Sequence, residues 1–375
     1  MVNIVIDDKI PFIRGVLESY ANVCYLSAKD IARQQLANVD ALVIRTRTRC
    51  NAELLDGTAV KFIASATIGY DHIDTEYCEE KGLKWTNAAG CNASSVEQYI
   101  LAALLEIANK RNFQLSDKTI GIVGVGNVGS EVARVAQILG MDTMLCDPPR
   151  AKKRGSEAFV SLNELVEKAD IITIHVSLSC EGADKTYGLF NPCIFSKIKK
   201  DTIFINTSRG EVVDEVALKG AINNGLLSDV VLDVWCNEPN VDTYLLNKVS
   251  IATPHIAGYS VDGKAMGTAM SVNALSRFFG WDLSSWFPSD LPMPKETLLT
   301  VDFARGTFEQ NLYKTVKHTY DIMSDHNRLK MLPDTFEEQR GSYPLRRQFT
   351  SYTVDAKGIT KTDRQKLNQL GFQLV

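Results

Sequence analysis

The sequence lacks the marks of a metal, disulfide, membrane or nucleic-acid-binding protein. Its eight cysteines include no CxxC pair and none lies after Cys236, so neither a zinc site nor a disulfide framework is expected. No uninterrupted apolar run approaches the ~18 residues of a membrane helix. The net charge of −4 gives no basic surface for nucleic acid or anionic lipid. We therefore expect a globular protein with no metal, no nucleic-acid partner and no membrane partner.

Length and the first residues narrow the class further. A chain of 375 residues, 45% of them apolar, is too long for one ordinary core and predicts two or three domains. The opening MVNIVIDDKI places two aspartates where a secretory signal needs its apolar run. A cytoplasmic location is expected.

Two series of short apolar runs predict two parallel sheets. The first hundred residues contain VNIVI, NVCYL, ALVI, KFIAS and LKWT, and the second series, from Lys118, contains TIGIVG, DTMLC, DIITI, TIFIN, DVVLD and VSIA. Continuously apolar strands separated by helix-length segments are typical of α/β sheets covered on both faces. Six such strands match the doubly wound, Rossmann-type dinucleotide-binding domain in number.

Helical periodicity and a change of composition set the expected domain boundaries. SSVEQYILAALLEIANK and SVDGKAMGTAMSVNALSRFFG both carry helical spacing, and the second is expected to return the chain to its first domain. The proline-rich stretch LSSWFPSDLPMP predicts a linker. The expected organisation is a substrate-binding domain of residues 1–97 and 257–285, a nucleotide-binding domain of residues 98–256, and a third domain of residues 286–375.

A glycine-rich turn predicts a dinucleotide site. Gly124, Gly126 and Gly129 form GxGxxG directly after TIGIV and before a helical run, which suits a tight turn, close approach to a pyrophosphate and close packing of helix on strand. Asp147, at the end of the next strand, can accept hydrogen bonds from ribose hydroxyls and would repel a 2′-phosphate. The alternative is a glycine-rich turn of any α/β protein, but strand, helix and acid together favour NAD.

Three polar residues follow later strands of the same series. They are Arg209 after TIFIN, Glu238 after DVVLDVWCN and His255 after VSIATP, and open α/β sheets bind ligands at these strand ends. Arg209 offers a donor fork for a carboxylate or carbonyl. His255 can exchange a proton, and Glu238 would fix its tautomer. Taken singly, each is better explained as a structural residue, whereas together they predict hydride transfer at a carbon bearing a hydroxyl and a carboxylate.

The motifs NTSRG, DVWCNEP and TPHIAG, with GVGNVG ahead of them, resemble those of the D-isomer-specific 2-hydroxyacid dehydrogenases over roughly residues 1–280. The resemblance implies that Arg209 holds the carboxylate, that Glu238 supports the histidine and that His255 is the acid/base. It also implies a flavodoxin-like substrate-binding domain. The expected cofactor-binding residues are Gly124, Gly126, Asn127, Val128, Gly129, Asp147, His175, Val176, Thr207, Ser208, Asp233 and Gly258.

A cluster of arginines bears on the substrate. IRTRTR places arginines at 45, 47 and 49, and in an extended segment these side chains would share one face. A phosphorylated substrate would offset their repulsion, and a solvated loop end is the alternative.

The stretches HIAGYSVDGKA and IRTRTR, with the appended C-terminal segment, resemble a branch of this family that acts on a phosphorylated 2-hydroxy acid. That resemblance implies a small C-terminal α+β dimerisation domain forming a homodimer. The expected substrate-binding residues are Arg45, Thr46, Thr67 and Tyr259, and the hypothesis that Arg346 and Arg347 reach the phosphate, in one chain or across a dimer, adds two more.

Two alternatives stay open at this point. The chain could be another dehydrogenase of the family, such as one acting on 3-phosphoglycerate. It could instead be a non-catalytic, NAD-sensing, corepressor-like dimer, although a sensor has no need of a proton-shuttling histidine.

Overall fold

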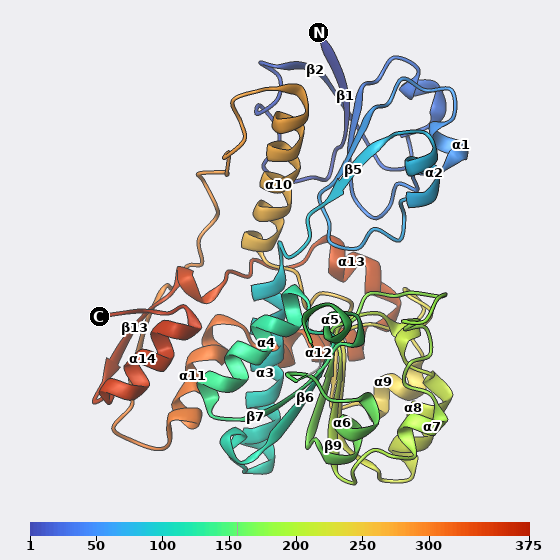
Figure 1. The fold of residues 1–375 in the computed structure, drawn as a ribbon. Coiled ribbons are helices and arrows are strands. Elements are labelled where there is room, and N and C mark those ends of the chain that lie inside the picture. Colours follow the sequence, from blue (N-terminus) through green and yellow to red (C-terminus); the bar gives the residue numbers. More distant parts are fainter. Residues whose placement is uncertain (156) are drawn as a thin grey trace. The chain divides into compact units, whose positions relative to one another are not determined.

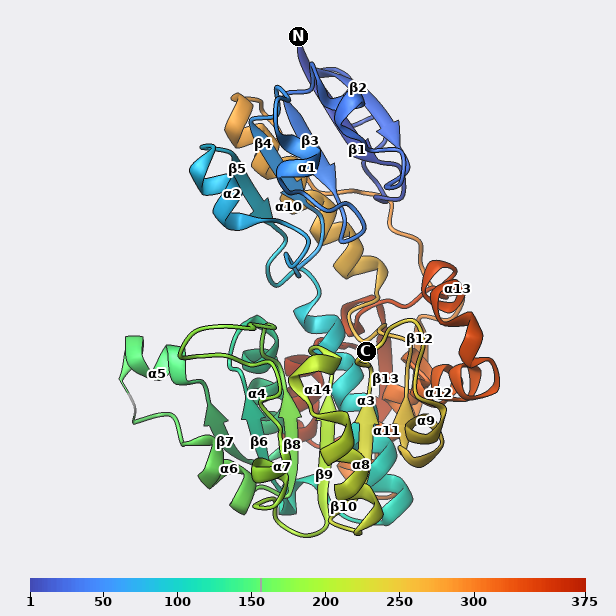
Figure 2. The same cartoon turned by 90° about the vertical axis from the view of Figure 1, so that its right-hand side faces the viewer.

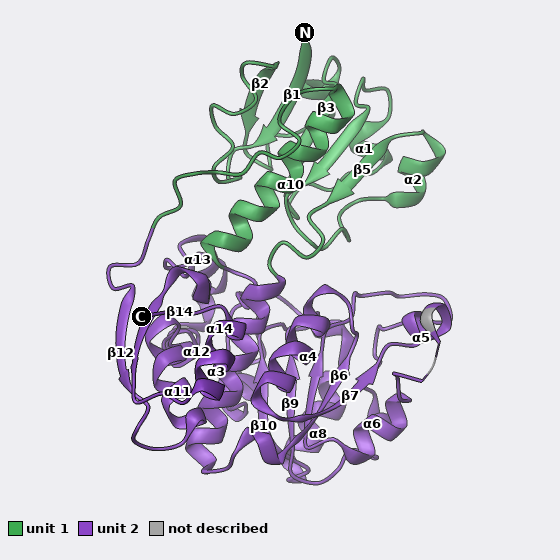
Figure 3. Ribbon diagram, turned by 60° about the vertical axis from the view of Figure 1, so that its left-hand side comes forward, with its two compact units in different colours: residues 1–92, 260–292 green, residues 93–259, 293–375 purple. Residues whose placement is uncertain are grey.

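The computed structural model describes residues 1–155 and 157–375 and divides into two compact units, coloured separately in Figure 3. Unit 1 contains residues 1–92 and 260–292, and unit 2 contains residues 93–259 and 293–375. The chain thus leaves unit 1 once and returns to it. The C-terminal segment, expected as a third domain, forms one compact unit with the nucleotide-binding sheet.

Unit 1 is a five-stranded parallel sheet in the order β2-β1-β3-β4-β5, the flavodoxin-like order. Along β1, Ile4 and Ile6 enter one apolar cluster and Val5 enters the other, so both faces of the sheet are buried. Helix α10 covers the first face through Val272 and Leu275. The elements are β1 Val2–Asp7, β2 Ala21–Leu26, η1 Arg33–Leu36, β3 Ala41–Ile44, α1 Ala52–Leu55, β4 Phe62–Ser65, α2 Thr75–Glu80, β5 Lys84–Asn87 and α10 Val261–Phe279.

Unit 2 contains a six-stranded parallel sheet in the order β11-β10-β9-β8-β6-β7. The strand order reverses between β6 and β8, and ligands bind such sheets beyond the strand ends at this reversal. The strands are β6 Thr119–Val123, β7 Asp142–Cys146, β8 Ile171–Ile174, β9 Thr202–Asn206, β10 Leu227–Leu232 and β11 Ile251–Ala252. Both predicted parallel sheets are confirmed (Figures 1 and 2).

Helices cover both faces of this sheet. Ile120 and Ile122 of β6 lie in the cluster that contains α3 and α4, whereas Ile172 and Ile174 of β8 lie in the cluster that contains α6 to α9. The helices are α3 Ala93–Arg111, α4 Asn127–Leu139, α5 Pro148–Arg154, α6 Leu162–Lys168, α7 Pro192–Phe195, α8 Glu215–Asn223 and α9 Thr243–Lys248, and the short turns are η2 Leu115–Asp117 and η3 Gly210–Val212. Among the described residues, no helix is both long and apolar enough to cross a membrane.

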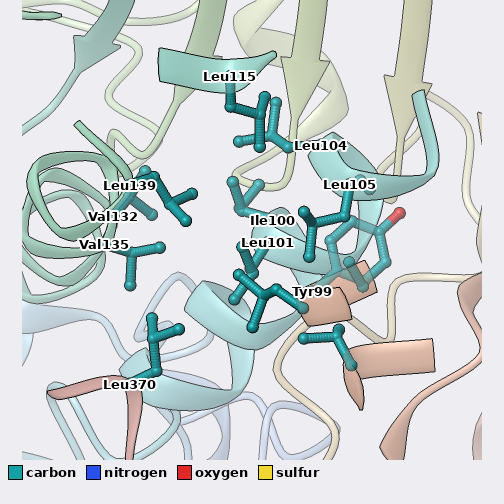
Figure 4. Close-up of a cluster of buried hydrophobic side chains, with 14 of the residues drawn as sticks. Tyr99, Ile100, Leu101, Leu104, Leu105, Leu115, Val132, Val135, Leu139 and Leu370 are labelled. Carbon is teal, nitrogen blue, oxygen red and sulfur yellow. The ribbon is translucent and has the colours of Figure 1, made fainter. Parts of the chain in front are cut away.

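The C-terminal segment adds a three-stranded parallel sheet, in the order β12-β13-β14, to unit 2. Leu312 of α11 and Leu370 of α14 belong to the same apolar cluster as α3 and α4, and Figure 4 shows this shared layer around Tyr99, Leu101 and Leu370. One continuous core explains why this segment is not a separate unit. Its elements are β12 Leu298–Asp302, α11 Phe308–Thr319, α12 Ile322–Met331, η4 Pro333–Thr335, α13 Phe336–Gly341, η5 Phe349–Ser351, β13 Thr353–Lys357, α14 Lys361–Leu370 and β14 Gln373–Leu374.

Phe204 of β9 provides a test of the core of unit 2. It is fully buried, and its ring centroid lies 5.2 Å from that of Phe190 and 5.5 Å from that of Phe195. Phe204→Ala should lower the free energy of unfolding by about 3–5 kcal/mol, because the site loses apolar contact and keeps a cavity. Chemical denaturation followed by circular dichroism measures the change. Val216→Ala, at a side chain that is 79% exposed, is the control, and an equal loss in both variants would contradict the assignment.

Candidate active site

The glycine-rich turn joins β6 to α4. At two of its three glycines the backbone packs so closely against other backbone atoms that no side chain would fit. Gly124 has φ +88°, and a Cβ there would lie 2.7 Å from the carbonyl oxygen of His175. A Cβ on Gly129 would lie 2.0 Å from the carbonyl oxygen of Gly124. At Gly126, by contrast, a Cβ would meet nothing within 4 Å. The turn is therefore closely packed at Gly124 and Gly129, and it is open at Gly126, where α4 begins.

The first turn of α4 suits an anion. Gly126 is the N-cap and provides no side-chain acceptor for the helix, so the amide groups at the start, from Asn127 and Val128 onward, are available to phosphate oxygens. Asp147 lies beside this turn, since its Oδ2 accepts a 2.9 Å hydrogen bond from the amide of Val125. The residues present thus fit the pyrophosphate and ribose of a dinucleotide.

His175 forms the wall of this cradle and is neutral. Its Nε2 lies 2.9 Å from Oγ1 of Thr173 and its Nδ1 lies 3.3 Å from Oγ1 of Thr207. The residue as a whole is partly exposed, but protein atoms surround its ring. This burial lowers the pKa of His175 to about 3. It can therefore make neutral hydrogen bonds and does not carry a charge to the site. Val176, next along, is the side chain that a Cβ on Gly124 would touch at 2.8 Å.

His255 and Glu238 form a hydrogen-bonded pair. His255 Nδ1 lies 2.7 Å from Glu238 Oε2, and Glu238 Oε1 accepts a 3.0 Å hydrogen bond from the amide of Trp235. Burial alone would raise the pKa of Glu238, but the hydrogen bond and charge of His255, the Trp235 amide and the charge of Arg340 together lower it. The carboxylate therefore stays ionised, orients the ring through Nδ1, and leaves Nε2 as the atom that can exchange a proton with a substrate.

The backbone at His255 is strained. Its φ of 55° lies in the left-handed region, which costs a residue other than glycine about 1–3 kcal/mol. The amide of His255 donates a 2.7 Å hydrogen bond to the carbonyl oxygen of Asp233. A conformation of this kind persists only where the surrounding contacts determine it.

Asp233, at the end of β10, supplies most of those contacts. Its buried carboxylate accepts hydrogen bonds from Thr253 Oγ1 at 2.6 Å, from the amide of Ile256 at 2.7 Å and from the amide of Ala257 at 2.9 Å. Sequence reasoning missed this bracing role, because nothing in LDVW reveals which amides the carboxylate meets. The expected place of Asp233 beside the nicotinamide stays a prediction.

Arg209 lies on the loop after β9, next to the loop that carries Glu238. Asn206 shapes this loop by accepting hydrogen bonds from the amide and the hydroxyl of Ser208 and by donating to the carbonyl oxygen of Arg209. A Cβ on Gly210 would lie 2.1 Å from the carbonyl carbon of Trp235, so only glycine lets the two loops touch. Because β9, β10 and β11 are neighbours in the sheet, the three expected catalytic residues leave adjoining strand ends.

In unit 1, the extended arrangement expected for the arginine cluster is wrong. Strand β3 ends at Ile44 and the chain turns at once, with the amide of Thr48 donating to the carbonyl oxygen of Arg45. Arg45 binds the buried carboxylate of Asp7 through Nε at 3.1 Å and Nη2 at 3.0 Å. This turn breaks the extended backbone that would place Arg45, Arg47 and Arg49 on one face. Thr46 is exposed on this turn.

Thr67 lies in a small hydrogen-bonded group at the end of β4. Its hydroxyl is 2.8 Å from that of Ser65, which lies 3.2 Å from Nε2 of His72. Burial lowers the pKa of His72, which favours the neutral ring. No role was predicted for this histidine, and the short spacing between Thr67 and His72 in SATIGYDHID was the only available hint.

The side chains of Arg346 and Arg347 are buried and contact other parts of the protein. Arg346 is 3% exposed and donates to the carbonyl oxygens of Ser95 and Ala257, and Arg347 is 7% exposed with Nη1 2.8 Å from Sδ of Met293. The hypothesis that this pair reaches a substrate phosphate does not fit such burial.

Tyr259 follows Gly258 and is partly exposed. Its ring meets that of Tyr343 edge to face, with the centroids 5.8 Å apart. Among the described residues, no group of three histidine, cysteine or acidic side chains could hold a metal ion.

Comparison with known proteins agrees with this geometry. Residues 97–257 match the NAD-binding domain of the D-isomer specific 2-hydroxyacid dehydrogenases, and residues 292–371 match a domain family of unknown function, DUF3410. The erythronate-4-phosphate dehydrogenase of Bacteroides thetaiotaomicron is 49% identical over 94% of this chain and 99% of its own length. That of Proteus mirabilis is 39% identical over 99% of both chains.

A solved structure supports the same assignment. D-lactate dehydrogenase from Aquifex aeolicus, in complex with NAD and lactic acid, aligns with a TM-score of 0.58 at 25% identity, covering 76% of this chain and 97% of its own. The predicted family, enzyme class and cofactor are confirmed. The chain belongs to the D-isomer specific 2-hydroxyacid dehydrogenases and is an NAD-dependent dehydrogenase.

Proposed function

We propose that the protein oxidises 4-phospho-D-erythronate at C2 to (R)-3-hydroxy-2-oxo-4-phosphooxybutanoate, a step of pyridoxal 5′-phosphate (vitamin B6) biosynthesis. The observation that carries the chemistry is the 2.7 Å contact between His255 Nδ1 and Glu238 Oε2, on the same sheet as the glycine-rich cradle. The choice of acid is supported by the erythronate-4-phosphate dehydrogenases that match this chain over nearly its whole length.

In the proposed reaction, the side chains of unit 2 divide the work. Arg209 binds the substrate carboxylate and orients the C2 oxygen with its planar donor fork. Nε2 of His255 takes the hydroxyl proton, and Glu238 stabilises the resulting imidazolium through Nδ1. The glycine-rich turn and Asp147 would hold NAD, which would supply the hydride acceptor for C2. The neutral ring of His175 adds no charge beside the cofactor.

Substrate choice is the direct test of this function. Purified protein with NAD should form NADH, seen by its near-ultraviolet absorbance, with 4-phospho-D-erythronate and not with 3-phosphoglycerate. Turnover of 3-phosphoglycerate alone would assign the chain to another dehydrogenase of the family. Binding of NAD without turnover of any acid would instead favour a sensing role.

Replacing His255 should remove the proton acceptor. His255→Ala should lower kcat by about 10²–10⁴-fold while leaving the dissociation constant for NAD nearly unchanged, because the cradle lies at β6 and α4. Steady-state NADH formation measures kcat, and a binding titration measures the dissociation constant for NAD. A variant that keeps the wild-type kcat would contradict the assignment.

We also propose that residues 293–375 form a homodimer contact. Met331 is 73% exposed and Leu332 is 55% exposed, and adjacent exposed apolar side chains favour association. Light scattering should give twice the chain mass of 41.5 kDa, and Met331→Glu with Leu332→Glu should give the single-chain mass. Val216→Glu, on α8, is the control. A wild-type protein that is already monomeric would refute the proposal.

A further inference from the structure

The loop that carries His255 is held from two sides. On one side, the carboxylate of Asp233 accepts hydrogen bonds from the amides of Ile256 and Ala257. On the other side, the guanidinium of Arg346 donates to the carbonyl oxygen of Ala257 at 2.5 Å and, at the longer distance of 3.5 Å, to that of Ile256. The two residues after His255 are thus fixed at both their N–H and their C=O groups.

Arg346 is built into this position. Its guanidinium also donates to the carbonyl oxygen of Ser95, near the start of α3, at 2.7 Å and lies 4.4 Å above the ring of Tyr320. A buried cation is unfavourable unless hydrogen bonds compensate for lost water, and the arginine fork can serve several carbonyl groups at once. The donors of Arg346 are therefore used by backbone carbonyl oxygens, including that of Ala257 in the loop that carries His255.

The far end of the same loop meets the same segment of the chain. Tyr343 packs edge to face on Tyr259, and the guanidinium carbon of Arg340 lies 5.8 Å from the centre of the Tyr259 ring. Residues 340–346 therefore contact the loop both directly after His255 and at Tyr259.

We propose that Arg346 is a positioning residue for proton transfer at His255, and that the C-terminal segment thereby takes part in forming the active site. The left-handed backbone of His255, with φ 55°, needs contacts on both sides to persist. Asp233 supplies one side and Arg346 the other. The inference rests on the proposed role of His255 and adds to it a residue from the C-terminal segment.

Three variants test this role. Arg346→Met removes the donors, Arg346→Lys keeps a charge without the fork, and Leu367→Ala destabilises the same segment from the buried face of α14. For each variant, the melting temperature, kcat per folded molecule, the KM for NAD and the hydrogen exchange of amides 255–259 are measured on the full chain.

Arg346→Met should lower kcat by on the order of 10²-fold, as expected when a reacting group is displaced by about an ångström, with little change in the KM for NAD. Its loop amides should exchange faster than in the wild type. Arg346→Lys should recover part of kcat and of the protection. Leu367→Ala should lower the melting temperature while keeping both kcat and loop protection.

Two results would overturn the inference. Unchanged loop exchange in Arg346→Met would show that the guanidinium does not hold the loop. Faster exchange with unchanged kcat would show that holding the loop does not position His255. A wild-type protein that turns over no phosphorylated acid would be recognised separately, since it would refute the proposed function before any variant is compared.

Discussion

The carboxylate of Asp233 is the interaction on which the catalytic edge of unit 2 depends. A buried anion must be saturated with hydrogen bonds, and this one obtains them from Thr253 and from the amides of Ile256 and Ala257. Its own backbone amide donates to Asn206, and its carbonyl oxygen accepts from His255. One residue therefore ties together the ends of β9, β10 and β11, from which the catalytic side chains extend.

The glycine-rich turn and the His255–Glu238 pair lie at different strand ends of the same sheet. At β6 and β8 the contacts are uncharged or backbone-based, with glycines that admit a phosphate and a neutral His175. At β10 and β11 an ionised Glu238 orients His255. This division keeps the charge of the catalytic pair away from the pyrophosphate cradle, while one rigid sheet fixes both.

Local patterns in the sequence were sufficient to predict both sheets and the glycine-rich turn, because apolar runs and glycine spacing act over a few residues. The roles of Arg209, Glu238 and His255 stay a prediction. Long-range partners were not predictable. Arg45 meets Asp7 across the sheet, and Arg346 meets Ala257, which is 89 residues away in the chain. The packing of the C-terminal segment was not predictable for the same reason, since no local pattern shows that Leu312 shares a core with α3.

Gly210 limits how this site can change. Because its α-carbon lies against the backbone of Trp235, any larger residue would push apart the loops bearing Arg209 and Glu238. A change of substrate preference that keeps these two loops in contact must therefore leave Gly210 unchanged. The contact between Gly210 and Trp235 thus limits which substitutions the loops bearing Arg209 and Glu238 can accept.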